Sequence, residues 1–357
     1  MTSKRNISVL LSTAFVLAAP PALAQASWTD SIKLSGDTRV RFETIDAEGS
    51  ASRERSRFRA RFAMEAKASD DLKLVFRFAT GEGSPVSTNV TMDGGFSGKN
   101  IFVDRAYADW RINDLWNVQV GKVKSPWFRP GGTGLLIDSD LNPEGIVLHG
   151  KSGALFGSVA ALSVEERSSS DDSLLLSAQG GWRGEINGTA SLTAGVGYYA
   201  YTNTVGQTPF YNGDPQGNTV DAAGNYVSDY KLLQLFAEYD TKIDDLPLTV
   251  FADLVQNTDA STSQDLAWTL GATVGFGKTD VGYAWVDTEA DAVLGTFNDS
   301  NFAGGFTDAN GHLIRVKYAV RNNVALGGTL IVSERGGFAG PAVDYNRLML
   351  DIEFSFK

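Results

Sequence analysis

Residues 53–68, RERSRFRARFAMEAKA, place an arginine at every second position from Arg53 to Arg61 and put mostly apolar side chains at the positions between and after them. On a helix, side chains two positions apart point in different directions, whereas on a β-strand they share one face. The segment therefore predicts a strand with a charged face that needs water. Its opposite face, which carries Phe58 and Phe62, needs an apolar environment.

The same alternation with a period of two recurs along the chain, and sixteen such segments can be delimited. Their connections alternate between seven short ones, such as Asn113-Asp114, and eight longer ones, such as residues 203–229. Alternating short turns and long loops are typical of antiparallel up-and-down barrels. The sequence thus predicts an all-β fold, a transmembrane antiparallel β-barrel of 16 strands with both chain ends on the short-turn side.

The N-terminal residues predict export from the cytoplasm. Lys4 and Arg5 precede an apolar run, residues 7–19, that is too short to span a membrane, and small residues at Ala24 and Ala26 offer cleavage sites. We expect 1–26 to be a signal peptide and 27–357 to form a single transmembrane β-barrel in the bacterial outer membrane.

Composition narrows the class of protein further. The chain has no cysteine, 38 glycines and a formal charge of −11, so neither disulfide stapling nor nucleic-acid binding is expected. A soluble periplasmic binding protein would need alternating strands and helices, but helical periodicity is scarce here. A soluble β-sandwich, the other alternative, would bury the apolar faces in a core instead of presenting them to lipid.

A barrel of sixteen strands encloses a water-filled channel, and the charged strand faces would line it. Arg53 and Arg55 are expected at the channel mouth, where they meet either water or lipopolysaccharide phosphates. The predicted basic wall of the pore consists of Arg39, Arg41, Arg57, Arg59, Arg61, Arg77 and Arg105.

The third long connection, within residues 120–145, differs from the others. Its sequence VGKVKSPWFRPGGTGLLIDSDLNPEG combines stiffening prolines with glycines that permit sharp bends. Residues 135–137 are apolar and suited to packing against the inner wall. We predict that Asp138, Asp140 and Glu144 present carboxylates to the channel and form its constriction, which gives a field across the pore with the arginines opposite.

Through this segment and the alternation over the mature chain, the sequence resembles the bacterial putative-porin family of outer-membrane proteins, which is distantly similar to general diffusion and phosphate-selective porins. The resemblance implies that the third long loop folds inward and that the protein is a homotrimer. The last strand, which ends at Phe356-Lys357, resembles the signal that the barrel-assembly machinery reads.

The only two histidines, His149 and His312, have no serine and acid arranged near them in the sequence, so catalysis is not expected, nor is a cofactor or a metal. The predicted function is a porin that lets small hydrophilic solutes and ions diffuse passively. One alternative is a substrate-specific channel for phosphate or another oxyanion. Another is a barrel without a channel, such as an adhesin, whose long loops carry the function.

Overall fold

The computed structural model describes residues 31–338 and 340–357, so the predicted signal peptide lies outside the described residues. Three short 3-10 helices, η2 (Pro130–Gly132), η3 (Gly295–Phe297) and η4 (Phe302–Gly305), lie in connections. The strands are β1 (Ile32–Ala47), β2 (Arg53–Lys67), β3 (Leu72–Thr80), β4 (Val90–Thr91), β5 (Ile101–Arg111), β6 (Trp116–Lys122), β7 (Glu144–Ser152), β8 (Leu155–Glu165), β9 (Ser173–Asn187), β10 (Ala190–Tyr201), β11 (Lys231–Ile243), β12 (Leu246–Asn257), β13 (Leu266–Phe276), β14 (Thr279–Thr288), β15 (Ala309–Arg321), β16 (Val324–Arg335) and β17 (Val343–Phe356).

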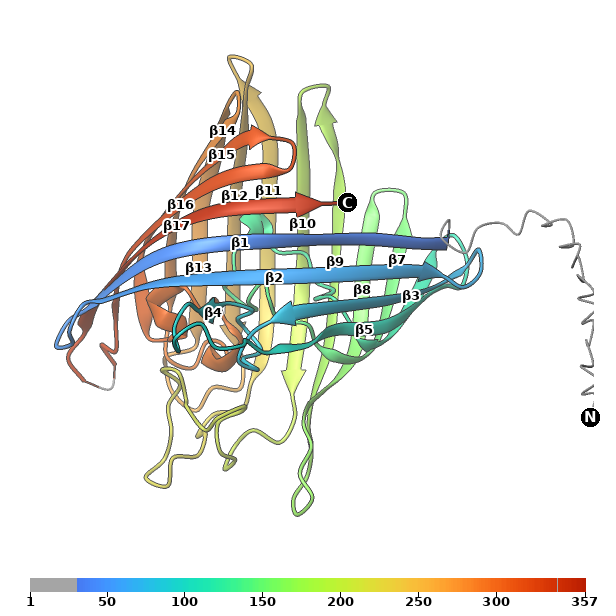
Figure 1. Cartoon of the computed structure of the whole chain (residues 1–357). Helices are drawn as coiled ribbons and strands as arrows, with labels where there is room; N and C mark the ends of the chain where they lie inside the picture. Colours follow the sequence, from blue (N-terminus) through green and yellow to red (C-terminus); the bar gives the residue numbers. More distant parts are fainter. Residues whose placement is uncertain (1–30, 339) are drawn as a thin grey trace, which may run out of the picture.

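Apart from the two-residue β4, each strand pairs antiparallel with its neighbours in chain order, so that β3 pairs with β5, and β1 also pairs with β17, which closes the sheet into a barrel. The closing ladder runs from Gly36 opposite Phe356 to Ala47 opposite Tyr345. Closure leaves no strand with unpaired backbone groups on the lipid side, where such groups cost several kcal/mol each. Figure 1 shows β1 and β2 crossing the front of this wall, with β17 beside β1 and β3 beside β2.

The two-residue element β4 pairs with β2 but belongs to the connection between β3 and β5, so the wall itself has sixteen strands, as predicted. Short turns and long loops alternate around it. The short turns include Gly277-Lys278 and Asn322-Asn323, and the long loops include residues 202–230. In Figure 1 the long green and yellow loops hang at the bottom and the short turns lie at the opposite end.

The two faces of the wall differ as the alternation predicts. On β2, Phe62 is 44% exposed, whereas Arg59 is 8% exposed and Arg41 on the neighbouring β1 is 5% exposed. An apolar side chain exposed on the outside of a closed barrel meets lipid, while an arginine enclosed by the wall meets partners inside it. No helix within the described residues is long and apolar enough to cross a bilayer.

Aromatic side chains mark one edge of the lipid-facing band. Trp110 and Trp116 flank the short turn between β5 and β6, and Trp182 pairs with Leu155 beside the turn between β7 and β8. All three indole rings are exposed on the described surface. Tryptophan favours the membrane–water interface, so these rings place the short turns at one boundary of the bilayer.

The outward face can be tested at Val40, which lies in the middle of β1 opposite Phe58 and Ile352. We expect Val40→Arg to lower the free energy of unfolding in lipid vesicles by about 2–4 kcal/mol, because the charge would lie near the centre of the bilayer. The matched control, Val40→Leu, keeps an apolar side chain and should change the free energy of unfolding little. Urea unfolding followed by tryptophan fluorescence measures both variants. Equal stability of the two would contradict the lipid-facing assignment.

Candidate pore constriction

The predicted basic wall is assembled by strand register. Arg39 lies directly opposite Arg59, and Arg41 lies opposite Arg57, across the β1–β2 ladder. Like charges in directly opposed positions destabilise a sheet unless counter-charges separate them. The same problem recurs where Arg77 on β3 faces Arg105 on β5.

Carboxylates on neighbouring strands supply the counter-charges. Asp37 accepts a hydrogen bond from Arg59 at 2.7 Å through one oxygen and from Arg61 at 2.8 Å through the other. Asp351 on β17 accepts two bonds from Arg41, each 2.7 Å long. Such paired, charge-assisted bonds fix the plane of each guanidinium group.

A third carboxylate, that of Glu43, is fully buried. It accepts a hydrogen bond from Arg347 at 2.6 Å and another from Arg55. Arg55 is thus held by the inner wall, while Arg53 is exposed at the start of β2 beside the long connection from β1.

A register shift between β3 and β5 adds another counter-charge. Asp104 is the extra residue next to the Arg77–Arg105 pair, which lets two consecutive side chains, Asp104 and Arg105, face the inside. Asp104 forms an ion pair with Arg77, and Arg105 donates to the Asn142 side chain at 2.7 Å. Sequence alternation alone predicts no inward place for Asp104.

Asp140 lies against the arginines. It belongs to the connection between β6 and β7, residues 123–143, which we call the third loop. Its carboxylate is 3.3 Å from Arg61 and accepts the Thr88 hydroxyl at 3.0 Å. Burial alone would raise the pKa of Asp140, but Arg59, Arg61 and Arg39 hold that pKa below its usual value. The carboxylate therefore stays charged beside the basic wall.

Asp138, only two residues away, points elsewhere. Its carboxylate is buried and accepts the backbone N–H groups of Asp140 at 2.7 Å and Ser300 at 2.9 Å. Burial first, and then the nearby Asp299 and Asp140, raise the pKa of Asp138. The side chain holds the third loop to another connection and is not open to a channel.

Glu144 lies one residue outside the third loop, although the sequence predicts it within the loop. It begins β7 and pairs with Lys122 on β6, and it lines a cavity together with Asp104 and Asp140. Its carboxylate accepts the Lys122 ammonium group at 2.7 Å. The reason is that the ladder between β6 and β7 extends one residue past the glycine pair Gly121–Gly145, which brings Glu144 into the strand.

The other side of the third loop is bonded to β9 and β11. The amide of Gln179 bonds both the N–H of Phe128, at 2.7 Å, and its carbonyl, at 3.0 Å. The indole of Trp127 donates to Ser177 at 3.1 Å, and the Gly131 N–H donates to Glu238 at 2.7 Å. The loop thus touches side chains on β9 and β11 as well as the arginines of β2 and β5.

A second connection, residues 289–308 between β14 and β15, braces the third loop. Phe297 accepts the Asp138 N–H at 2.8 Å, and the Asp299 N–H donates to the Gly134 carbonyl at 3.0 Å. Arg41 also reaches the Asn301 side chain. The sequence does not distinguish this connection from an ordinary surface loop, because both are rich in Gly and Asn.

In the part of the chain that the structure describes, two cationic side chains beside the loop, Lys124 and Arg105, have no carboxylate partner. Lys124 faces Arg105, Arg129 and Arg77, and burial followed by these three charges lowers the pKa of Lys124. Among the described residues, the buried Nη2 atom of Arg77 has no hydrogen-bond partner. Positive charge therefore exceeds negative charge at this point of the wall.

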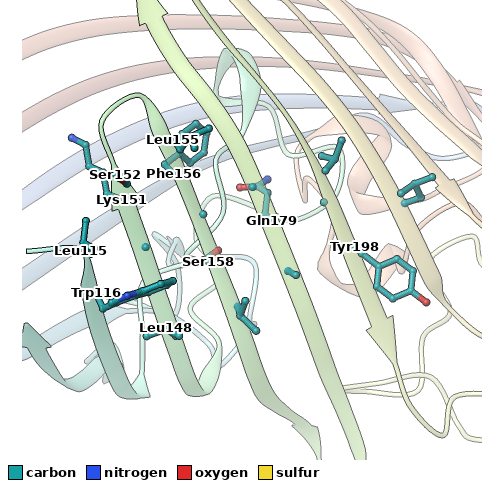
Figure 2. Close-up of a pocket in the computed structure, with 18 residues that line it drawn as sticks. Leu115, Trp116, Leu148, Lys151, Ser152, Leu155, Phe156, Ser158, Gln179 and Tyr198 are labelled. Atoms are coloured by element: carbon teal, nitrogen blue, oxygen red, sulfur yellow. The ribbon is translucent and has the colours of Figure 1, made fainter. Parts of the chain in front are cut away.

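The outer wall carries a large apolar hollow that extends from β6 to β11 and is separate from these charges (Figure 2). Its lining includes three glycines that lie opposite one another on β7, β8 and β9, namely Gly150, Gly157 and Gly180, together with Trp116 and Leu148. Gly150 lies opposite the exposed Trp116, so the hollow is on the lipid side of the wall.

The closed sixteen-strand wall with an apolar outside and a charged inside defines a porin-type outer-membrane barrel. A sequence model of the family described as Putative porin matches residues 46–220 and 210–356. The chain therefore belongs to this family, and it forms an outer-membrane diffusion channel. A comparison with curated proteins finds no match.

Solved structures show the same fold. A high-pH structure of OprB from Pseudomonas putida is 14% identical, with a TM-score of 0.64, and the match covers 92% of this chain and 95% of that chain. A mutant of the Rhodopseudomonas blastica porin is also 14% identical, with a TM-score of 0.55, and the match covers 91% and 100%. At 14% identity these matches show a shared fold, and they do not show which solutes pass through this protein.

The ion-pair network can be tested at Asp351. We expect Asp351→Asn to lower the free energy of unfolding by about 3–5 kcal/mol, because it leaves the largely buried Arg41 without its counter-charge. Asp344→Asn, on the same strand but exposed, serves as the control and should change it by less than about 0.5 kcal/mol. Urea unfolding in vesicles compares them. An Asp351→Asn protein as stable as the control would contradict the assigned role of Asp351.

Proposed function

We propose that the barrel is a passive, water-filled channel for small hydrophilic solutes and ions, and that the third loop narrows it. The observation that carries the proposal is the set of hydrogen bonds that link the loop to Arg61 and Arg105 on one side and to Gln179 and Glu238 on the other. A segment held between these two parts of the inner surface leaves solutes a reduced cross-section. Passage needs no chemical step.

The electrostatics favour anions over cations. Eight arginines of the network share five carboxylates, Asp37, Glu43, Asp104, Asp140 and Asp351. Arg105 and Lys124 add two further positive charges without adding a carboxylate. Since charge inside a narrow pore sets ion preference, we infer a moderate preference for anions.

The charges also act across the pore. Asp140 lies on the third loop and the arginines lie on the wall, so a polar solute passing beside them experiences a transverse field. Such a field orients dipolar solutes and disfavours apolar ones. We therefore propose that Asp140 contributes to this field, as the sequence predicts, and that Asp138 holds the loop in place.

A phosphate- or oxyanion-specific channel is the second candidate, favoured by the unpartnered buried nitrogen of Arg77. Conductance that saturates with a single anion would support it. A surface barrel or adhesin without a channel would instead show no conductance at all after reconstitution.

We also propose how the chain reaches the outer membrane and assembles there. Residues 1–26 are removed as a signal peptide during export, and the barrel-assembly machinery inserts the chain. The protein functions as a homotrimer, as the resemblance to porins implies. The exposed Arg53 contacts lipopolysaccharide at the outer mouth.

Reconstitution in a planar bilayer tests the channel and its ion preference. Under a potassium chloride gradient we expect a reversal potential of the sign that chloride gives. The variant Arg105→Gln/Lys124→Gln should shift this potential toward zero, because it removes two positive charges beside the third loop. The variant Lys67→Gln/Lys242→Gln removes two exposed charges elsewhere and should leave it unchanged. A cation-selective wild-type channel would refute the inferred preference.

The narrowing role of the third loop has a separate test. We expect Gln179→Ala/Glu238→Ala to raise single-channel conductance and current noise, because the loop loses three hydrogen bonds to β9 and β11. The control variant Thr193→Ala/Thr249→Ala removes inward hydroxyl groups from β10 and β12 that do not contact the loop. Conductance that is unchanged in the first variant would show that the loop does not limit flow.

A further inference from the structure

A second cationic region lies at the short-turn end of the barrel, apart from the third loop. A cavity of about 500 Å³ opens there between the turns Gly277-Lys278 and Asn322-Asn323 and the strands β1, β2 and β17. Its walls carry five cationic side chains and two carboxylates: Arg59, Arg61, Lys278, Lys317 and Arg321, with Asp37 and Glu353.

The two carboxylates do not neutralise this cavity. Both oxygens of Asp37 are taken by Arg59 and Arg61. Glu353 lies 3.7 Å from Lys317, a loose contact between partly exposed groups that contributes little. The five cations and two carboxylates of the lining leave three positive charges in excess, and Asp140, which reaches Arg61 from the third loop, reduces this excess to two.

Two of the cations have no carboxylate of their own: Lys278 lies in a turn, and Arg321 is the last residue of β15. The Lys278 ammonium group donates only to the Val320 carbonyl, at 3.4 Å. Within residues 31–338 and 340–357, Arg321 has no ion pair. Lys317 belongs to the inner face, because its register partner Gly327 lies opposite the inward Asp351.

A second cavity at the same end shows that the charge excess is local. The cavity between β3 and β7, of about 350 Å³, carries four aspartates against two lysines and one arginine: Asp70, Asp71, Asp109 and Asp114, with Lys73, Lys151 and Arg111. The short-turn end is thus not cationic throughout, and positive charge is concentrated beside β15 and β16.

We propose that the cavity beside β15 and β16 is a binding site for small multivalent oxyanions, of the phosphate or polycarboxylate class, after they have passed the third loop. Lys278 and Arg321, which have no carboxylate partner, and the weakly paired Lys317 suit an anion with more than one negative charge, and the amides of Asn322 and Asn323 supply neutral donors. Arg61 connects the two regions, since it lines the cavity and also meets Asp140. The proposal rests on the proposed aqueous channel.

Inorganic phosphate is the probe. In a planar bilayer with chloride as the current carrier, we expect phosphate added on the short-turn side to reduce the current at lower concentration than phosphate added on the other side. The variant Lys278→Gln/Lys317→Gln/Arg321→Gln should raise the half-inhibiting concentration several-fold. The control Lys73→Gln/Lys151→Gln/Arg111→Gln, in the cavity between β3 and β7, should leave it unchanged.

Equal weakening in both triple variants, or no inhibition of a conducting wild-type channel, would overturn the site while leaving the channel function intact. Absence of any conductance would instead reject the proposed function itself. Phosphate in lipid headgroups has the same chemistry, so the experiment is repeated with phosphatidylcholine and with added phosphatidylglycerol. Inhibition that is the same in both membranes supports a soluble ligand. Inhibition that is lost with phosphatidylglycerol assigns the cavity to headgroups and overturns the proposal.

Discussion

The whole structure depends on the requirement that backbone N–H and C=O groups be paired within a medium that offers no water. The ladder between β1 and β17 meets this requirement by closing the sheet. Closure at once separates two environments, lipid outside and polar groups inside. Every later feature follows from that separation, because a side chain's position on its strand then decides which environment it meets.

Closure also crowds the inner face with charge. The register of β1 against β2 sets Arg39 against Arg59, and that of β3 against β5 sets Arg77 against Arg105. The wall tolerates these pairs because carboxylates such as Asp37 bridge two guanidinium groups at once. Structure and selectivity therefore share one set of residues: the carboxylates hold the arginines, and the charges that remain unbalanced act on the solute.

Two connections, rather than one, build the region beside the arginines. The third loop lies between side chains of β2 and β5 and those of β9 and β11, and residues 289–308 hold its acidic turn through Phe297 and Ser300. The burial of Asp138 follows from this contact. The sequence predicts that Asp138 faces the pore, but its carboxylate instead holds the third loop to residues 289–308. Asp140 stays beside the basic wall.

The sequence alone determined the sixteen strands, their inward and outward faces and the alternation of short and long connections, because side-chain alternation is a local property with a period of two. It did not determine which carboxylate meets which arginine, nor that Glu144 belongs to β7. It also gave no sign of the inward Asp104 or of the cationic cavity beside β15 and β16. These features join residues far apart in the chain, and only the register of the closed sheet and the packing of its loops bring such residues together.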